Sequence, residues 1–316
     1  EIRNCDWSSD VCSSDLRKVP SMIGNAQTGQ DRPALGIILM IFALFVLASM
    51  DAVAKHLTET LAAPQILAVR FWIFLTFSSL IASRRGLKQA AHSNNPRLQI
   101  VRTLVLVVEM TMFLVAFSFL PLAEVHAIAA VSPLIVMALA AIFLGERIGP
   151  RRWTAVAAGF LGVMLIIRPG AGVFDPISLL ALAGAFGWAT YQVLLRAVAR
   201  IDQPDTTTLY TAGIGVICFT IAAPFFWKSP SPETWGWLAA VGILGSVGHF
   251  LLPAAFKFAP ASTLQPFAYT MPVWAVFLGW AVFNHIPDFW TLTGGSIVIC
   301  SGLFALWRER KVGVRR

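Results

Sequence analysis

The sequence predicts an all-α integral membrane protein of ten transmembrane helices, arranged as two inverted five-helix repeats. The first observation is composition: 57% of the 316 residues are hydrophobic and 13% are charged, whereas a soluble domain carries about 25% charged residues. The second is an internal repeat, because AFSFLPLAEVHAIAAVSP at 116–133 returns in altered form as AFKFAPASTLQPFAYTMP at 255–272. The third is the distribution of Lys and Arg along the chain.

Ten segments are long and apolar enough to cross a bilayer, which requires about 20 mostly apolar residues. They lie at 34–54, 64–82, 99–119, 123–143, 153–168, 174–195, 207–227, 235–256, 262–283 and 290–307. The fifth is short, so we expect it to stand nearly upright or to thin the bilayer locally.

Small residues and prolines distinguish particular spans. The fifth and tenth carry small residues that permit close backbone approach, namely Ala155, Gly159, Gly162, Gly294, Gly295 and Gly302. Pro133 and Pro272 occupy matching depths in the fourth and ninth spans, where we expect each to free a backbone carbonyl and kink the helix.

The positive charges predict the orientation. Of the 24 Lys and Arg residues, 20 fall on the side of the membrane that holds the N-terminus. Three fall on the other side, namely Lys55, Arg168 and Lys228, and Arg70 lies within a span. Basic loops stay in the cytoplasm, so both termini are predicted to be cytoplasmic. Each repeat holds five spans, an odd number, and the second repeat must therefore enter the membrane from the opposite side.

The predicted organisation is a leader at 1–33, a first repeat at 34–170, a second repeat at 174–310 and a basic cytoplasmic tail at 311–316. The leader is Ser/Asp-rich without the apolar core of a secretory signal. We interpret it as disordered and non-native, since it resembles translated cloning or adaptor sequence. Cys5, Cys12, Cys218 and Cys300 lack metal-site or CxxC spacing.

Several stretches resemble the drug/metabolite transporter superfamily of the EamA type, over about residues 34–310. They are FLPLAEVHAIAAVSPLIVMALAAIFLGERIG after the third span and its counterpart APASTLQPFAYTMPVWAVFLGWAVF. MDAVAKHL at 50–57, PQILAVR at 64–70 and APAS at 259–262 are similar to a bacterial subgroup that includes riboflavin and S-adenosylmethionine uptake transporters. The resemblance implies a solute cavity lined by both repeats, with the fifth and tenth helices peripheral. One departure is Phe283-Asn284-His285, where the first repeat has Leu-Gly-Glu.

Three charged residues fall within or near the first two spans. Asp51 and Lys55 have i,i+4 spacing and share a helix face, and Arg70 lies about 9 Å into the second span. We expect the three to meet at a similar depth, either as a self-neutralising structural cluster or as an outer gate that binds a charged solute.

Glu109 and His249 occupy near-equivalent positions midway along the third and eighth spans. Glu109 is a candidate to bind a cationic group or a proton, and His249 to hydrogen-bond a solute. The alternative is that each satisfies a neighbouring helix. Glu124 and His126 are expected at a hydrated loop edge.

Aromatic and amide residues complete the candidate cavity. Trp188, Tyr191 and Gln192 share one face of the sixth span, and Gln265, Tyr269 and Trp274 follow a looser stripe in the ninth. Rings flanked by amides suit a planar or heterocyclic organic solute, although such stripes also serve helix packing.

These features predict a secondary transporter that moves a small organic metabolite by alternating access. Uptake of a vitamin- or nucleoside-like solute is favoured by the subgroup resemblance, and export of amino acids or toxic organic compounds is the alternative. An intramembrane lipid enzyme and a non-transporting scaffold are the rivals from other classes. The expected partners are the solute and the lipid bilayer; a homodimer is left open. We expect no enzyme activity, catalytic residue, metal, cofactor or nucleic-acid partner.

Overall fold

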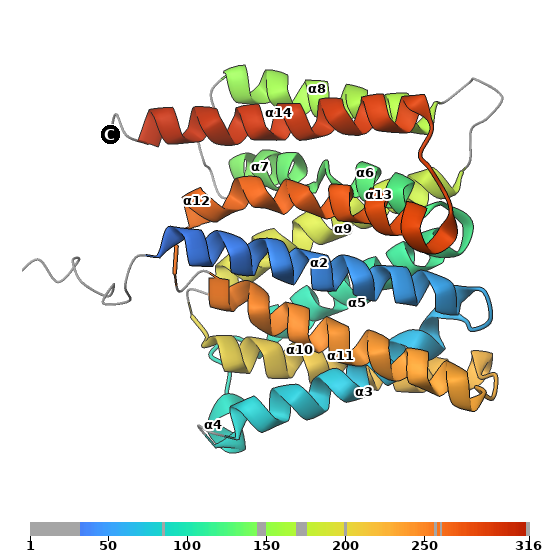
Figure 1. Ribbon diagram of the computed structural model, residues 1–316. Helices are drawn as coiled ribbons and strands as arrows, with labels where there is room; N and C mark the ends of the chain where they lie inside the picture. Colours follow the sequence, from blue (N-terminus) through green and yellow to red (C-terminus); the bar gives the residue numbers. More distant parts are fainter. Residues whose placement is uncertain are drawn as a thin grey trace, which may run out of the picture.

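The computed structural model describes residues 32–83, 86–143, 150–168, 176–198, 201–255, 258–259 and 261–313. Every regular element in these ranges is a helix (Figure 1), which confirms the all-α fold class. The leader before residue 32, the junction at 169–175 and residues 314–316 lie outside the described residues, so the domain boundaries stay predictions.

Most of the predicted spans are single helices. They are α2 (Pro33–Thr58), α3 (Ala63–Ala82), α5 (Pro96–Phe119), α8 (Pro150–Ile167), α9 (Ile177–Val198), α11 (Pro232–Ala255) and α14 (Phe289–Gly313), with the short α4 (Leu87–Ala90) between α3 and α5. Within the described ranges, nine segments are long and apolar enough to cross a membrane, and Trp153–Ile167 is shorter. The short fifth span is therefore confirmed.

Proline marks where several helices begin. It occupies the first or second position of α2, α3, α5 and the seventh-span helix α10 (Pro204–Ala222), where its missing N–H costs nothing. The Asn95 side chain caps α5 by accepting a hydrogen bond from the Leu98 N–H at 3.1 Å. The short η1 (Ala223–Phe226) then continues α10.

The fourth and ninth spans are both interrupted. The fourth consists of α6 (Leu122–Ala129) and α7 (Ser132–Phe143), and the ninth consists of α12 (Ala261–Leu264), η2 (Gln265–Tyr269) and α13 (Thr270–Phe283). Each interruption lies just before the repeated proline, Pro133 or Pro272. The structure thus confirms a break at matching depth in the two repeats.

Packing between helices relates the two repeats by an approximate twofold axis, and the odd number of spans in each repeat makes the second repeat inverted. α2 packs along α11, and α5 packs along α9. Because α2 and α9 are the first helices of the two repeats and α5 and α11 are the third, each repeat makes the same contact with the other. α3 packs on α10, α6 on α13 and α8 on α14, so each of these helices meets its own counterpart. The start of α2 and the end of α14 lie on one side of the bundle (Figure 1). We call this side the terminal face and the other the opposite face.

The α8–α14 pair lies at one edge of the bundle (Figure 1), as the peripheral fifth and tenth helices were expected to. A Cβ atom on Gly162 would lie 2.8 Å from the Gly294 carbonyl oxygen, and one on Gly294 would lie 2.5 Å from the Gly162 carbonyl oxygen. Any larger residue at either position would push the helices apart, which confirms the prediction from small residues.

At the terminal face, a buried carboxylate joins the two repeats. Asp202, between α9 and α10, accepts hydrogen bonds from Ser93 Oγ at 2.5 Å, the Asn94 N–H at 2.8 Å and Gln99 Nε2 at 2.8 Å. Burial raises the pKa of Asp202, but the hydrogen bonds from these residues outweigh it and hold the pKa below its ordinary value. Asn94 Nδ2 also donates to the Ile201 carbonyl at 2.7 Å. We call this group the Asp202 clasp.

At the opposite face, a second set of contacts joins the repeats through the equivalent loops. Gln65 Nε2 donates to the Lys228 carbonyl at 2.7 Å, and the Lys228 N–H donates to Gln65 Oε1 at 3.0 Å. Lys228 Nζ donates to the Thr60 carbonyl at 3.3 Å. Thr60 is the counterpart of Ile201 when Lys55 is aligned with Arg196. The two clasps therefore use the backbone carbonyl at equivalent loop positions, Thr60 at the opposite face and Ile201 at the terminal face. We call this group the Lys228 clasp.

Candidate functional site

A charged network crosses the boundary between the repeats inside the membrane-spanning region. Arg70 on α3 approaches His249 on α11, with Nη2 and Nε2 3.4 Å apart. The Arg70 guanidinium also lies within electrostatic range of Asp51 on α2 and Glu109 on α5. Charges in hydrocarbon are costly unless they face one another or water, and the position of the Arg70 guanidinium near the Asp51 and Glu109 carboxylates offsets part of that cost. It brings together four of the predicted site residues.

Glycines let the helices approach closely enough to form this network. A Cβ atom on Gly245 of α11 would lie 3.3 Å from Arg70 Nε and 2.9 Å from Met50 Sδ. A Cβ atom on Gly187 of α9 would lie 3.0 Å from Glu109 Cβ. Gly245 therefore leaves space for the Arg70 side chain, and Gly187 lets α9 pack on the helix that carries Glu109.

Glu109 has an unused hydrogen-bonding atom. The residue is 5% exposed, and its Oε2 is buried without a hydrogen-bond partner among the described residues. Most buried polar atoms in proteins are paired. An unpaired carboxylate oxygen near Arg70 keeps an unused capacity to accept a hydrogen bond or a proton.

The expected cluster of Asp51, Lys55 and Arg70 is divided in the structure. Lys55 Nζ donates to the carbonyls of Phe117 and Leu120, each at 2.7 Å. These carbonyls lie at the end of α5, where the last helical turn lacks intrahelical donors. Lys55 therefore caps α5, and the prediction that it joins Asp51 and Arg70 in one cluster is corrected.

Asp51 instead faces His126 on α6. Its Oδ2 lies 3.3 Å from His126 Nε2, an approach that lacks hydrogen-bond geometry. His126 is 8% exposed, so the expectation of a hydrated loop edge is wrong for this residue. The turn at 120–121 redirects the chain so that the start of α6 packs inside the bundle.

Arg102 is a buried polar residue that sequence reasoning missed. The prediction counted Arg102 only as one of the 20 basic residues on the cytoplasmic side, but it is 0% exposed on α5. Its guanidinium donates to Gln99 Oε1 at 3.1 Å and Thr211 Oγ1 at 2.8 Å, and lies 5.3 Å from the centre of the Tyr191 ring. The signal in the sequence was its spacing from Gln99, which places both side chains on one helix face.

The aromatic residues of α9 form a stack beside Arg102. The rings of Trp188 and Tyr191 are 5.3 Å apart and inclined by 28°, and Arg102 lies against Tyr191. Trp188, Tyr191 and Gln192 are all half-buried. The predicted stripe is thus a layered aromatic and cationic surface at the boundary with α5.

The three candidate cavity residues of the ninth span do not lie together in the structure. Trp274 packs edge-on against Phe45 of α2 with ring centres 5.0 Å apart, and its Nε1 is buried without a partner in the described part of the chain. The Tyr269 hydroxyl instead points at Gly302 of the peripheral α14. Gln265 belongs to η2, but its side chain lies outside the described residues. The structure therefore separates Tyr269 from the network.

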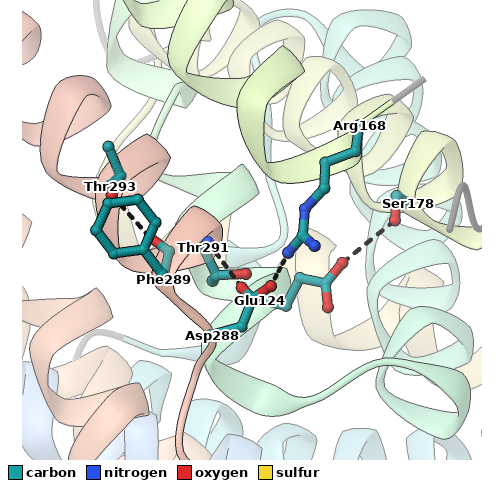
Figure 2. Close-up of polar contacts among 7 residues, drawn as sticks. All are labelled: Glu124, Arg168, Ser178, Asp288, Phe289, Thr291 and Thr293. Atoms are coloured by element: carbon teal, nitrogen blue, oxygen red, sulfur yellow. Dashed lines mark hydrogen bonds and ion pairs between the residues drawn. The ribbon is translucent and has the colours of Figure 1, made fainter. Parts of the chain in front are cut away.

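A cavity of about 380 Å³ opens at the opposite face, which we call the opposite-face cavity. In Figure 2, Arg168 at the end of α8 extends toward Asp288, with which it forms an ion pair, and Ser178 Oγ donates to Glu124 Oε1 at 3.4 Å. The lining of the opposite-face cavity combines residues from both repeats: Phe119, Leu120, Pro121, Glu124, Ile166, Ile167, Arg168, Ser178, His285, Ile286, Pro287, Asp288 and Thr291.

The EamA-like transporter family matches two separate stretches of the chain, at residues 34–168 and 176–307. These stretches coincide with the two inverted sets of helices.

Curated relatives match over almost their whole length. A riboflavin transporter of Vibrio cholerae is 26% identical, over 88% of this chain and 95% of the relative. An S-adenosylmethionine uptake transporter of Rickettsia bellii is 27% identical over 88% of this chain and 95% of the relative. A pseudopaline exporter of Pseudomonas aeruginosa is 25% identical over 87% of this chain and 97% of the relative.

A solved structure, described only as the crystal structure of a protein, shares the fold with a TM-score of 0.60. It is 21% identical to this chain and covers 88% of this chain and 99% of its own.

Proposed function

The chain belongs to the EamA-like transporter family, and from this premise we propose that it imports a vitamin- or nucleoside-like metabolite by alternating access. The solute binds at the network of Asp51, Arg70, Glu109 and His249, between the aromatic surface of Trp188 and Tyr191 and the ring of Trp274. No chemical step on the solute is part of this proposal.

The observation that carries the proposal is the position of the charged network. Arg70 and Glu109 come from the first repeat and His249 from the second. A site made by both repeats changes its access when one repeat tilts against the other. The unpaired Oε2 of Glu109 supplies a binding position that the protein does not fill itself.

The two clasps support rocking of the repeats. The Asp202 clasp joins the repeats at the terminal face, and the Lys228 clasp joins them at the opposite face. An alternating-access cycle opens one face while the other stays closed. In our proposal each clasp therefore breaks in one half of the cycle and holds in the other.

The relatives support a planar organic solute. A riboflavin transporter and an S-adenosylmethionine uptake transporter align with nearly the whole chain, and heterocyclic solutes suit aromatic surfaces such as Trp188. Export is the alternative function, because a pseudopaline exporter is 25% identical over 87% of this chain.

We place the protein in the bacterial inner membrane with its terminal face in the cytoplasm. Basic residues concentrate on that face, at Arg97, Arg151 and Arg308 for example, and positive loops are retained in the cytoplasm. The opposite face then contacts the periplasm.

The test uses purified protein in liposomes, with riboflavin and S-adenosylmethionine as probes. A transported probe should raise the melting temperature, because it binds the folded state, and should accumulate inside the liposomes. Arg70→Gln should remove both effects, whereas Arg97→Gln, a charge on the terminal face, should preserve them. Accumulation by Arg70→Gln at the wild-type rate would refute the assigned site.

A further inference from the structure

The opposite-face cavity has the properties of a binding site separate from the charged network. Its volume of about 380 Å³ falls within the range of small-molecule sites, which is about 300–1,000 Å³. Apolar side chains such as Ile166 and Ile286 form part of the wall, and polar side chains such as Arg168 and Thr291 form the rest. Such a lining fits an amphipathic organic molecule rather than an inorganic ion.

Arg168 offers the cavity a donor that the protein does not use. Its Nη2 is engaged by Asp288, but its Nε is buried without a hydrogen-bond partner among the described residues. Arg168 also adopts a positive φ of 51°, in the left-handed region, just after the last residue of α8. The Arg168 side chain lines the cavity and is 24% exposed, and rotation of its guanidinium would turn the unpaired Nε toward a ligand with an acceptor oxygen or nitrogen.

The cavity adjoins the barrier in front of the charged network. Leu120 lines the cavity, and its carbonyl accepts a hydrogen bond from Lys55 Nζ at 2.7 Å. Lys55 also lies 5.7 Å from the centre of the Phe283 ring. One helical turn below Lys55 on α2 is Asp51, which belongs to the network. Lys55 therefore contacts both a residue of the cavity wall and Phe283, one helical turn away from the network.

We propose that the opposite-face cavity is a vestibule that captures the solute before transport, with Arg168 Nε binding an acceptor atom of an amphipathic solute. Ile166 and Ile286 contact its apolar part. Lys55 and Phe283 form the barrier that must move before the solute reaches Asp51. This inference rests on the proposed transport function and adds a second solute site to it.

The test measures whether solute shields the cavity from a membrane-impermeant thiol reagent. In a background with all four cysteines of the chain replaced by Ser, Ile286→Cys places a thiol on the cavity wall, where Ile286 is 70% exposed. Ser231→Cys is the control, because Ser231 is exposed on the same face outside the cavity. Saturating riboflavin or S-adenosylmethionine should slow labelling of Ile286→Cys by about fivefold, as expected for an occupied concave site, and leave the control unchanged.

Arg168→Lys distinguishes solute binding from a structural role. Lysine keeps the positive charge for Asp288 but lacks the Nε donor, so half-protection should require about tenfold more probe, as expected for one hydrogen bond to a charged donor. Asp288→Asn removes the ion pair and keeps Arg168 Nε, so protection should persist at the wild-type probe concentration. Equal behaviour of the two variants would assign Arg168 to structure alone and overturn its role as the binding donor.

Failure of the vestibule and failure of transport give different results. If a probe accumulates in liposomes but does not protect Ile286→Cys, the vestibule is wrong and transport stands. If a probe protects Ile286→Cys but does not accumulate, the site exists and the transport function is wrong. If neither probe protects, the vestibule proposal is rejected.

Discussion

Asp202→Asn tests how strongly the Asp202 clasp holds the two repeats together. Oδ2 of Asp202 accepts from Ser93 Oγ at 2.5 Å and from Gln99 Nε2 at 2.8 Å, and both donors belong to buried residues. An Asn amide placed there would set its NH2 against the Gln99 NH2. A hydrogen bond to a charged group contributes about 1.5–3 kcal/mol. Loss of the Gln99 bond and weakening of the Ser93 bond should therefore destabilise the protein by about 2–4 kcal/mol.

The stability difference between the wild type and Asp202→Asn should depend on pH in a defined direction. Hydrogen bonding holds the pKa of Asp202 in the folded protein below its ordinary value of 3.8. The ionised carboxylate therefore stabilises the fold at pH values above 3.8, and this contribution is lost as the pH falls through the folded pKa. The difference in stability between wild type and Asp202→Asn should be complete near neutral pH and should shrink below 3.8.

The assay is thermal unfolding in detergent, followed by tryptophan fluorescence across this pH range. Ser93→Ala is the graded comparison, because it removes one donor and keeps the carboxylate. It should cost about 1.5–3 kcal/mol, and it should retain a smaller pH dependence than the wild type, because the Ser93 hydrogen bond is one of those that lower the pKa of Asp202. Wild-type stability of Asp202→Asn at neutral pH, or a deficit that does not shrink in acid, would refute the reasoning.

Three further predictions concern transport. If Glu109 carries a transported proton, Glu109→Gln should abolish pH-driven uptake and preserve counterflow exchange; unchanged pH-driven uptake would contradict the role. Trp188→Ala should weaken solute binding by about 1–3 kcal/mol if the indole stacks on a heterocycle, measured by titration, and a loss of folded protein alone would indicate packing. Gly245→Ala should lower uptake because its Cβ would lie 3.3 Å from Arg70 Nε. Gly236→Ala on the same helix has open space around it and should retain uptake; equal uptake by both variants would exclude steric control at Arg70.

The arrangement of spans was predictable because it depends on local features of the chain. A stretch of apolar residues must form a helix in lipid to satisfy its own backbone, and the odd number of spans in each repeat requires inversion. The breaks before Pro133 and Pro272 and the close contact of Gly162 with Gly294 also follow from the residues at those positions.

The partners of the polar residues were not predictable in the same way. The i,i+4 spacing placed Asp51 and Lys55 on one helix face, but it carried no information about the helices that pack there. The end of α5 brings free carbonyls to Lys55, and the buried start of α6 brings His126 to Asp51. Arg102 was counted with the cytoplasmic charges because it lies close to the start of a span, whereas packing of α10 and α9 encloses it completely.

By itself the sequence determined the membrane class, the spans, their breaks and the inversion of the repeats, since hydrophobicity and backbone hydrogen bonding act over short stretches of chain. Only the tertiary structure decided which charges meet and where a cavity remains. The contact of Arg70 with His249, the two clasps and the opposite-face cavity join residues that are distant in sequence. Their geometry is set by how closely the helices pack, and glycines such as Gly187 and Gly245 allow the close approach at individual contacts.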